Sequence, residues 1–113
     1  MSEATEQQAV VEWCGWNSIP VFAIPNGGRR NAKEAYFLRK SGVKAGVSDL
    51  FVPVPKGGFS GLFIELKVGR NTATETQKQW LELLGGNGYR AEVCRGARAA
   101  IELIREYIGE ADI

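Results

Sequence analysis

The 113-residue sequence contains no histidine. This absence excludes Ser-His catalytic triads, imidazole acid–base chemistry and zinc sites with histidine ligands. Any catalysis must therefore use carboxylates, lysine and bound water, and we expect a hard metal ion to assist them. Such a set of groups suits the hydrolysis of phosphodiesters better than acyl transfer.

Cysteine and long apolar runs are also scarce. Cys14 and Cys94 stand alone, without C-x-x-C spacing, so we interpret them as buried apolar residues in a reducing cytoplasm. No apolar run approaches the roughly 18 residues that a membrane span needs, and we do not expect the polar, acidic N-terminus to be a signal peptide. We therefore expect a cytoplasmic protein with no membrane partner.

The composition is that of one compact domain covering residues 1–113. Hydrophobic residues make up 44% and charged residues 24% of the chain, which is ordinary globular usage. This length suffices for one domain and not for two. A domain of this size has a thin stability margin, which favours a homodimer.

Positive charge is concentrated in the middle of the chain, although the net charge is only +1. Between Arg29 and Lys78 there are ten Lys and Arg against four Asp and Glu, a local charge of +6. This distribution predicts a polyanionic substrate, and a solvated mixed surface is the alternative. The residues that we expect to contact nucleic acid are Asn26, Arg29, Arg30, Lys33, Lys44, Arg70 and Lys78.

A predicted β-hairpin over residues 46–67 carries two carboxylates and a lysine. Its arms are rich in Phe, Val, Leu and Ile and flank a P-K-G-G-F turn. If the loop covers residues 55–59, the numbers of facing residues sum to 114, so Asp49 lies opposite Glu65. Lys67 follows Glu65 by two residues and therefore projects from the same face. Opposed carboxylates require a counter-charge, from the lysine or from a divalent metal such as Mg²⁺. The alternative is a solvated strand end with a surface ion pair.

The remaining segments give the order α-β-(α)-β-β-α-β-α. A helix capped by Ser2 has an apolar stripe that ends at Cys14 and Trp16, and a buried strand follows it. A hairpin followed by a crossover helix and a fourth strand predicts an α/β fold, with a mixed sheet flanked by helices. The expected segments outside the hairpin are helices at 2–16, 32–41, 74–84 and 97–108, strands at 20–24 and 89–94, and a loop at 25–31.

Two polar helix residues each allow a structural and a functional interpretation. Glu6 suits the positive N-terminus of the first helix, or it is a third acid that reaches a metal cluster through water. Gln77 closes a T-x-x-Q capping box with Thr74, or it points a polar group at the water or phosphate near Glu65. The sequence leaves both alternatives open.

The ordered motifs resemble those of the PD-(D/E)xK nuclease superfamily, and more closely a stand-alone VRR-NUC (virus-type replication-repair nuclease) domain. Ser48 departs from the pattern, because the superfamily often has proline before the aspartate. The resemblance implies a restriction-endonuclease-like αβββαβ core, a similarity to dimeric Holliday-junction resolvases, and a protein of a bacterium or of a phage in its host cytoplasm. The matching elements are Glu6, P-N-G-G-R at 25–29, G-V-S-D at 46–49, I-E-L-K at 64–67, and Gln77 with Trp80.

The resemblance also implies a DNA endonuclease that uses Mg²⁺ or Mn²⁺. Lys67 would stabilise the transition state, and Gln77 would orient the attacking water or Lys67. The expected substrate is branched DNA, a four-way junction cut by a homodimer. The alternatives are a restriction-type, flap or nicking nuclease, and a non-catalytic nucleic-acid-binding module. The implied metal ligands are Asp49, Glu65, the backbone carbonyl of Leu66 and Glu6 through water.

Overall fold

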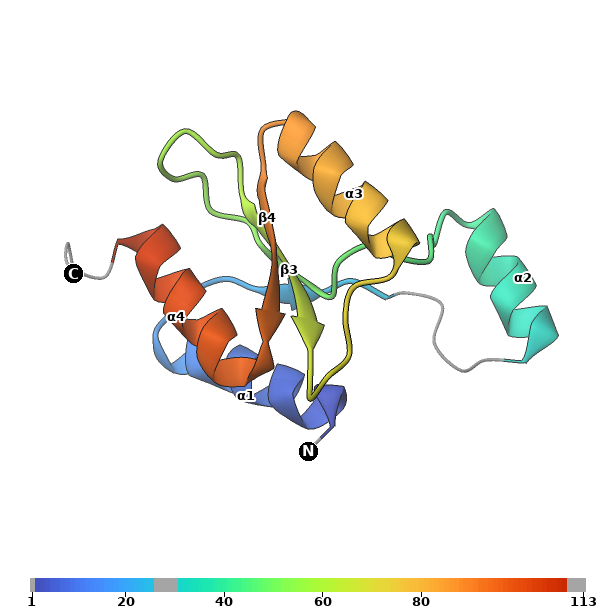
Figure 1. Cartoon of the computed structure of the whole chain (residues 1–113), viewed down its shortest axis with the longest axis horizontal. Coiled ribbons are helices and arrows are strands. Elements are labelled where there is room, and N and C mark those ends of the chain that lie inside the picture. Colours follow the sequence, from blue (N-terminus) through green and yellow to red (C-terminus); the bar gives the residue numbers. More distant parts are fainter. Residues whose placement is uncertain (1, 26–30, 110–113) are drawn as a thin grey trace.

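The computed structural model describes residues 2–25 and 31–109. It confirms the predicted order of elements and the mixed α/β class (Figure 1). No helix within these residues is long and apolar enough to cross a membrane. The elements are α1 (Glu3–Trp16), β1 (Phe22–Ala23), α2 (Ala32–Lys40), β2 (Leu50–Val52), β3 (Leu62–Lys67), α3 (Glu75–Gly86), β4 (Arg90–Arg95) and α4 (Gly96–Ile108).

The four strands form one mixed sheet in the order β1-β2-β3-β4. β2 is antiparallel to β1 and to β3, whereas β4 runs parallel to β3. Leu50 pairs with Ile64, and Val52 pairs with Leu62. These pairs have the register predicted for the hairpin, since 50 and 64, like 52 and 62, sum to 114.

The hairpin turn is tighter than predicted. Lys56 and Phe59 exchange two backbone hydrogen bonds, of 3.0 and 2.9 Å, around Gly57 and Gly58, whose φ angles are 58° and 88°. Two positive φ angles are what a two-residue hairpin turn requires. The numbers of this pair sum to 115, whereas those of the pairs in β2 and β3 sum to 114. The first arm therefore has one more residue than the second between the turn and the paired strands, as in a β-bulge. The predicted five-residue loop is therefore wrong, but the bulge preserves the register of β2.

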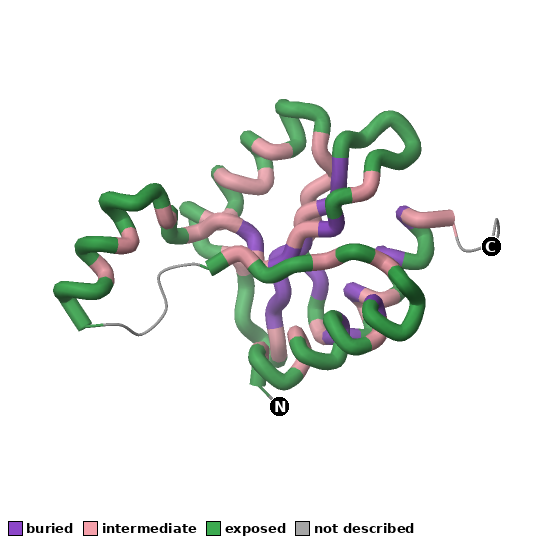
Figure 2. Tube along the Cα trace, turned by 180° about the vertical axis from the view of Figure 1, so that it is seen from behind, coloured by how far each residue is buried: buried purple, intermediate pink, exposed green. Residues whose placement is uncertain are grey.

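One side of the β2–β3 pair forms the core. The even-numbered residues of these strands are fully buried and join buried residues of α1 and α4 in one apolar cluster. Because strand side chains alternate, Glu65 and Lys67 project from the other face, where α3 begins. Helices thus cover both faces of the sheet (Figure 1), and the buried residues gather along its central strands (Figure 2).

Two sequence predictions about apolar residues were wrong. The strand predicted at 20–24 is reduced to Phe22–Ala23, and both residues are exposed because β1 lies at the edge of the sheet. Trp16 is 81% exposed and is not part of the buried stripe of α1. It follows the buried Cys14 by two residues, which turns the helix by about 200° and points its side chain away from the sheet.

We expect Ile64→Ala to lower the free energy of unfolding by about 2–5 kcal/mol, because it empties a fully buried position in β3. Leu83→Ala is the control, since Leu83 is 53% exposed on α3 and its truncation should change stability by no more than about 0.5 kcal/mol. Urea unfolding monitored by circular dichroism measures both values. Equal losses in the two variants would contradict the assignment of the core.

Candidate active site

Asp49 is anchored where the chain enters β2. Its backbone N–H donates to the carbonyl of Ile64 at 3.0 Å, and its own carbonyl accepts from the N–H of Ile24 at 2.9 Å. Its side-chain Oδ2 accepts a hydrogen bond of 2.7 Å from the backbone N–H of Leu66. These contacts hold the Asp49 carboxylate beside β3, next to Glu65.

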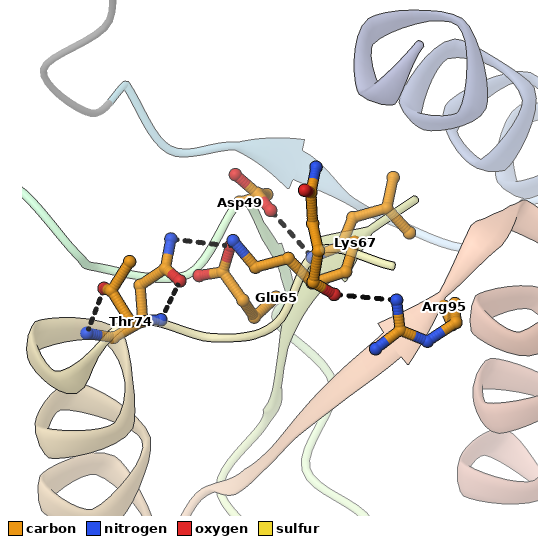
Figure 3. A network of polar contacts seen from close by, with 8 residues as sticks. Asp49, Glu65, Lys67, Thr74 and Arg95 are labelled. Carbon is orange, nitrogen blue, oxygen red and sulfur yellow. Dashed lines mark hydrogen bonds and ion pairs between the residues drawn. The ribbon is translucent and has the colours of Figure 1, made fainter. Parts of the chain in front are cut away.

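The Glu65 carboxyl group is the centre of the site (Figure 3). Glu65 is 1% exposed. Its Oε2 accepts a hydrogen bond of 3.3 Å from Nε2 of Gln77 and lies 3.8 Å from Nζ of Lys67. Its Oε1 is buried and accepts no hydrogen bond from the described residues. The site therefore has one carboxylate oxygen to which no described protein group donates.

Burial and the neighbouring Asp49 raise the pKa of Glu65 from 4.5 to about 8. Burial has the largest effect because it disfavours the ionised form. Asp49 adds to it, both through a hydrogen bond to the protonated acid and through the repulsion of its charge, and Glu3 adds a smaller repulsion. The Lys67 ammonium acts in the opposite direction. The positive charge around this pair of acids is therefore too small for both of them to be fully ionised at neutral pH.

The pair fits a hard divalent cation. A cation beside Asp49 and Glu65 would satisfy Oε1 of the ionised Glu65 and offset the repulsion between the two carboxylates. Mg²⁺ binds oxygen atoms and often uses only one or two carboxylates, taking its other ligands from water and from phosphates. Among the described residues, no group of three or more acidic or cysteine side chains gathers in a way that could hold a metal. A metal at this pair would therefore take most of its ligands from groups other than carboxylates.

Gln77 forms the predicted capping box, and the same side chain also reaches Glu65. Its Oε1 accepts from the backbone N–H of Thr74 at 2.8 Å, and its backbone N–H donates to Oγ1 of Thr74 at 3.2 Å, which completes the capping box. The other end of the same amide donates to Glu65. A single side chain therefore starts α3 and contacts the buried acid.

A glycine lets the loop before Asp49 pack against the start of α3. A Cβ atom at Gly46 would lie 2.6 Å from the Thr76 side chain and 3.2 Å from its backbone. Gly46 also has a φ of 91°, which disfavours other residues. The segments that carry Asp49 and Gln77 therefore lie in direct contact.

Arg95 supports the site from β4, and the sequence did not suggest this. It pairs with Lys67 in the parallel register of β3 and β4. Its Nη1 donates to the carbonyls of Gly69 and Asn71, at 2.6 and 2.7 Å. Figure 3 shows one of these bonds. These bonds hold the loop from β3 to α3, so Arg95 is a positioning residue for the start of α3. Only the parallel pairing of distant strands reveals this contact.

Glu6 lies in the first turn of α1, as predicted, and contacts α4, while its contact with a metal through water stays a prediction. Its Oε1 accepts a hydrogen bond of 3.1 Å from the backbone N–H of Ala97 at the start of α4, so it does not join Asp49 and Glu65 in an acidic cluster. Glu3, three residues earlier in the sequence, is the acid of α1 whose charge acts on Glu65. Both acids stand in the first turn of α1, and only the packing of α1 distinguishes them.

Four of the predicted nucleic-acid contacts are solvent exposed: Lys33, Lys44, Arg70 and Lys78. Arg70 lies in the loop before α3, and Lys78 lies in its first turn, one residue after Gln77. The other three, Asn26, Arg29 and Arg30, lie outside the described residues.

We expect the stability of the protein to fall as pH rises between about 4.5 and 8, with a contribution from Glu65 of up to about 1.4 kcal/mol per pH unit. The sign follows because the folded protein keeps a proton on Glu65 that the unfolded chain has already released. Glu65→Gln cannot ionise and should remove this contribution. Chemical denaturation across this pH range measures it.

The exposed Glu12 on α1 provides the control. Glu12→Gln should keep the pH dependence of the wild type. If Glu65→Gln kept it as well, the raised pKa of Glu65 would be contradicted.

The comparisons with known proteins agree with this geometry. A family model described as the VRR-NUC domain matches residues 2–98. A solved structure described as a VRR_NUC domain protein is 31% identical in sequence and superposes with a TM-score of 0.84. The similarity covers 96% of this chain and 89% of that one. No curated protein matches the sequence.

Proposed function

Because this chain belongs to the VRR-NUC domain family, we propose that it is a divalent-metal-dependent DNA endonuclease, with a four-way junction as its preferred substrate. The observation that carries the proposal is the buried carboxyl of Glu65, held among Asp49, Lys67 and Gln77, with one oxygen that accepts no hydrogen bond from the described residues. The family suggests a nuclease, and this group of side chains contains the acids and the cation that hydrolysis of a phosphodiester requires.

Asp49 and Glu65 would hold Mg²⁺ or Mn²⁺, with the Leu66 carbonyl as a third ligand by analogy with the superfamily. When bound, the metal supplies a water of lowered pKa and neutralises negative charge on the phosphate. Lys67 adds a fixed positive charge 3.8 Å from Glu65, and such preorganised charges favour a transition state in which negative charge develops. Gln77 orients the Glu65 carboxyl through its amide.

Basic residues around the site would hold the DNA backbone. Arg70 is exposed in the loop before α3, Lys78 is exposed directly after Gln77, and Lys44 is exposed in the segment that leads to Asp49. Contacts with phosphates position a substrate without reading its sequence, so we expect selectivity to depend on the shape of the DNA. In a homodimer, two such sites would act on opposite strands of a junction.

We expect Asp49→Asn and Glu65→Gln each to slow the cleavage of a labelled four-way junction in Mg²⁺ or Mn²⁺ by roughly a hundredfold or more, the scale on which single electrostatic groups act in catalysis. Gel analysis with a matched linear duplex measures both the rate and the preference for the junction. Glu12→Gln, on the exposed side of α1, should cut like the wild type.

Metal binding has its own readout in the same experiment. Mg²⁺ or Mn²⁺ should raise the melting temperature of the wild type, because a ligand of the folded state stabilises it, and the two variants should lose this shift. Cleavage by the variants at the wild-type rate would overturn the proposal. Junction binding without any cleavage would favour a non-catalytic binding module, and equal cutting of the duplex would favour a restriction-type, flap or nicking nuclease.

Gln77→Ala and Thr74→Ala separate capping from positioning. Each removes part of the capping box and should lower the free energy of unfolding by about 1 kcal/mol. Only Gln77→Ala also removes the contact with Glu65, so it alone should slow cleavage, by about 10–100-fold, as for other groups that orient a metal ligand. Rates measured well below both unfolding midpoints test this. Equal rates in the two variants would leave Gln77 with a capping role only.

A further inference from the structure

Helix α2 (Ala32–Lys40) projects from the body of the protein (Figure 1). None of its nine residues is buried, as the exposed colouring of the helix shows (Figure 2). No other described helix or strand packs extensively against it. A helix this short is only marginally stable by itself, and its Asn31 cap helps to stabilise it. Its side chains are therefore available to a binding partner.

The outward face of α2 combines aromatic rings with lysines. At about 100° per residue, Lys33, Tyr36, Phe37 and Lys40 fall within one arc of about 100° around the helix axis. Tyr36 is 49% exposed and Phe37 is 58% exposed. The two rings meet edge to face with their centroids 5.7 Å apart, and Nζ of Lys40 lies 5.4 Å from the centre of the Tyr36 ring.

We propose that this aromatic-basic face of α2 binds unpaired bases at or beside a DNA branch, an inference that rests on the proposed function. Proteins that hold single-stranded nucleic acid place aromatic rings, on which bases stack, beside positive charges that follow the backbone. The helix carries three basic residues and one acid, Lys33, Arg39 and Lys40 against Glu34, a net charge of +2. That charge is complementary to DNA.

The same charges argue against a second copy of the chain as the occupant. An apolar dimer interface over Tyr36 and Phe37 would enclose the ammonium groups of Lys33 and Lys40, and burying a charge without a partner is costly. A nucleotide instead offers a flat ring to the aromatics and a phosphate to the lysines. The face therefore suits DNA better than it suits an identical face.

The face is also linked to the candidate active site. The chain runs from the end of α2 past the exposed Lys44 to Gly46, which packs against Thr76 at the start of α3. Three residues later it reaches Asp49. In the proposed complex, DNA held at the active site would extend along this connection toward α2, and bases that leave the duplex at a branch would meet its rings.

The test compares the wild type with the double variant Tyr36→Ala/Phe37→Ala. The probes are a duplex with a short single-stranded gap, labelled with 2-aminopurine in the gap, and the same duplex fully paired, both without divalent metal so that neither is cut. The double variant should bind the gapped DNA about tenfold or more weakly and lose the change in 2-aminopurine fluorescence. Its affinity for the paired duplex and its melting temperature should not change.

Trp16→Ala is the matched control, because it removes a ring that is 81% exposed on another helix. It should bind both DNA molecules like the wild type. Binding to the gapped duplex should therefore depend on the rings of α2 and not on any exposed aromatic ring.

Three outcomes for the double variant would overturn the inference. If it bound both DNA molecules more weakly by the same factor, the face would contact the DNA backbone without stacking on bases. If its DNA binding were unchanged and its sedimentation coefficient were lower than that of the wild type, the face would bind a second copy of the chain. Unchanged binding and sedimentation would assign it neither role, while cleavage of junctions would still support the proposed function. If the wild type bound and cut no DNA, the proposed function would fail as well.

Discussion

The pairing of β2 with β3 is the constraint on which the rest of the structure depends. The even-numbered residues of both strands are buried against α1 and α4, and a shift of one residue would turn them all to the opposite face. The same shift would send Asp49 and Glu65 into the apolar core. Burial of apolar surface therefore fixes the position of the two acids, and the bulge near the turn absorbs the one residue that does not fit this register.

The candidate site is electrostatically unfavourable without a further positive charge. Burial of an ionised carboxylate is costly, and Lys67 and Gln77 compensate for it only in part, since the pKa of Glu65 remains at about 8. Stability elsewhere in the fold offsets this cost. Arg95 of β4 holds the loop before α3, and the cap at Thr74 fixes the first turn of that helix. Both β4 and α3 therefore support the site at the end of β3.

The protein separates a buried site from an exposed helix. The acids lie on or next to the central strands, where the buried residues gather, whereas α2 has no buried residue and presents its rings to solvent. If α2 binds DNA as proposed, recognition and the chemistry of the acids would belong to separate elements. The basic residues follow this division, because Lys33 lies on α2 and Lys78 lies beside the site.

The sequence by itself determined the order of elements, the hairpin register, the capping box and the placement of the acids with Lys67 on one face. These follow from local rules, namely the alternation of side chains along a strand and the hydrogen bonds at a helix start. The tight turn and its bulge were missed, because several loop lengths suit the same two arms. Only the tertiary structure decided that Glu6 contacts Ala97, that Glu3 acts on Glu65, and that Arg95 holds the loop before α3. Each of these contacts joins segments far apart in the chain, so it depends on how the helices and the parallel strands pack and not on any local pattern.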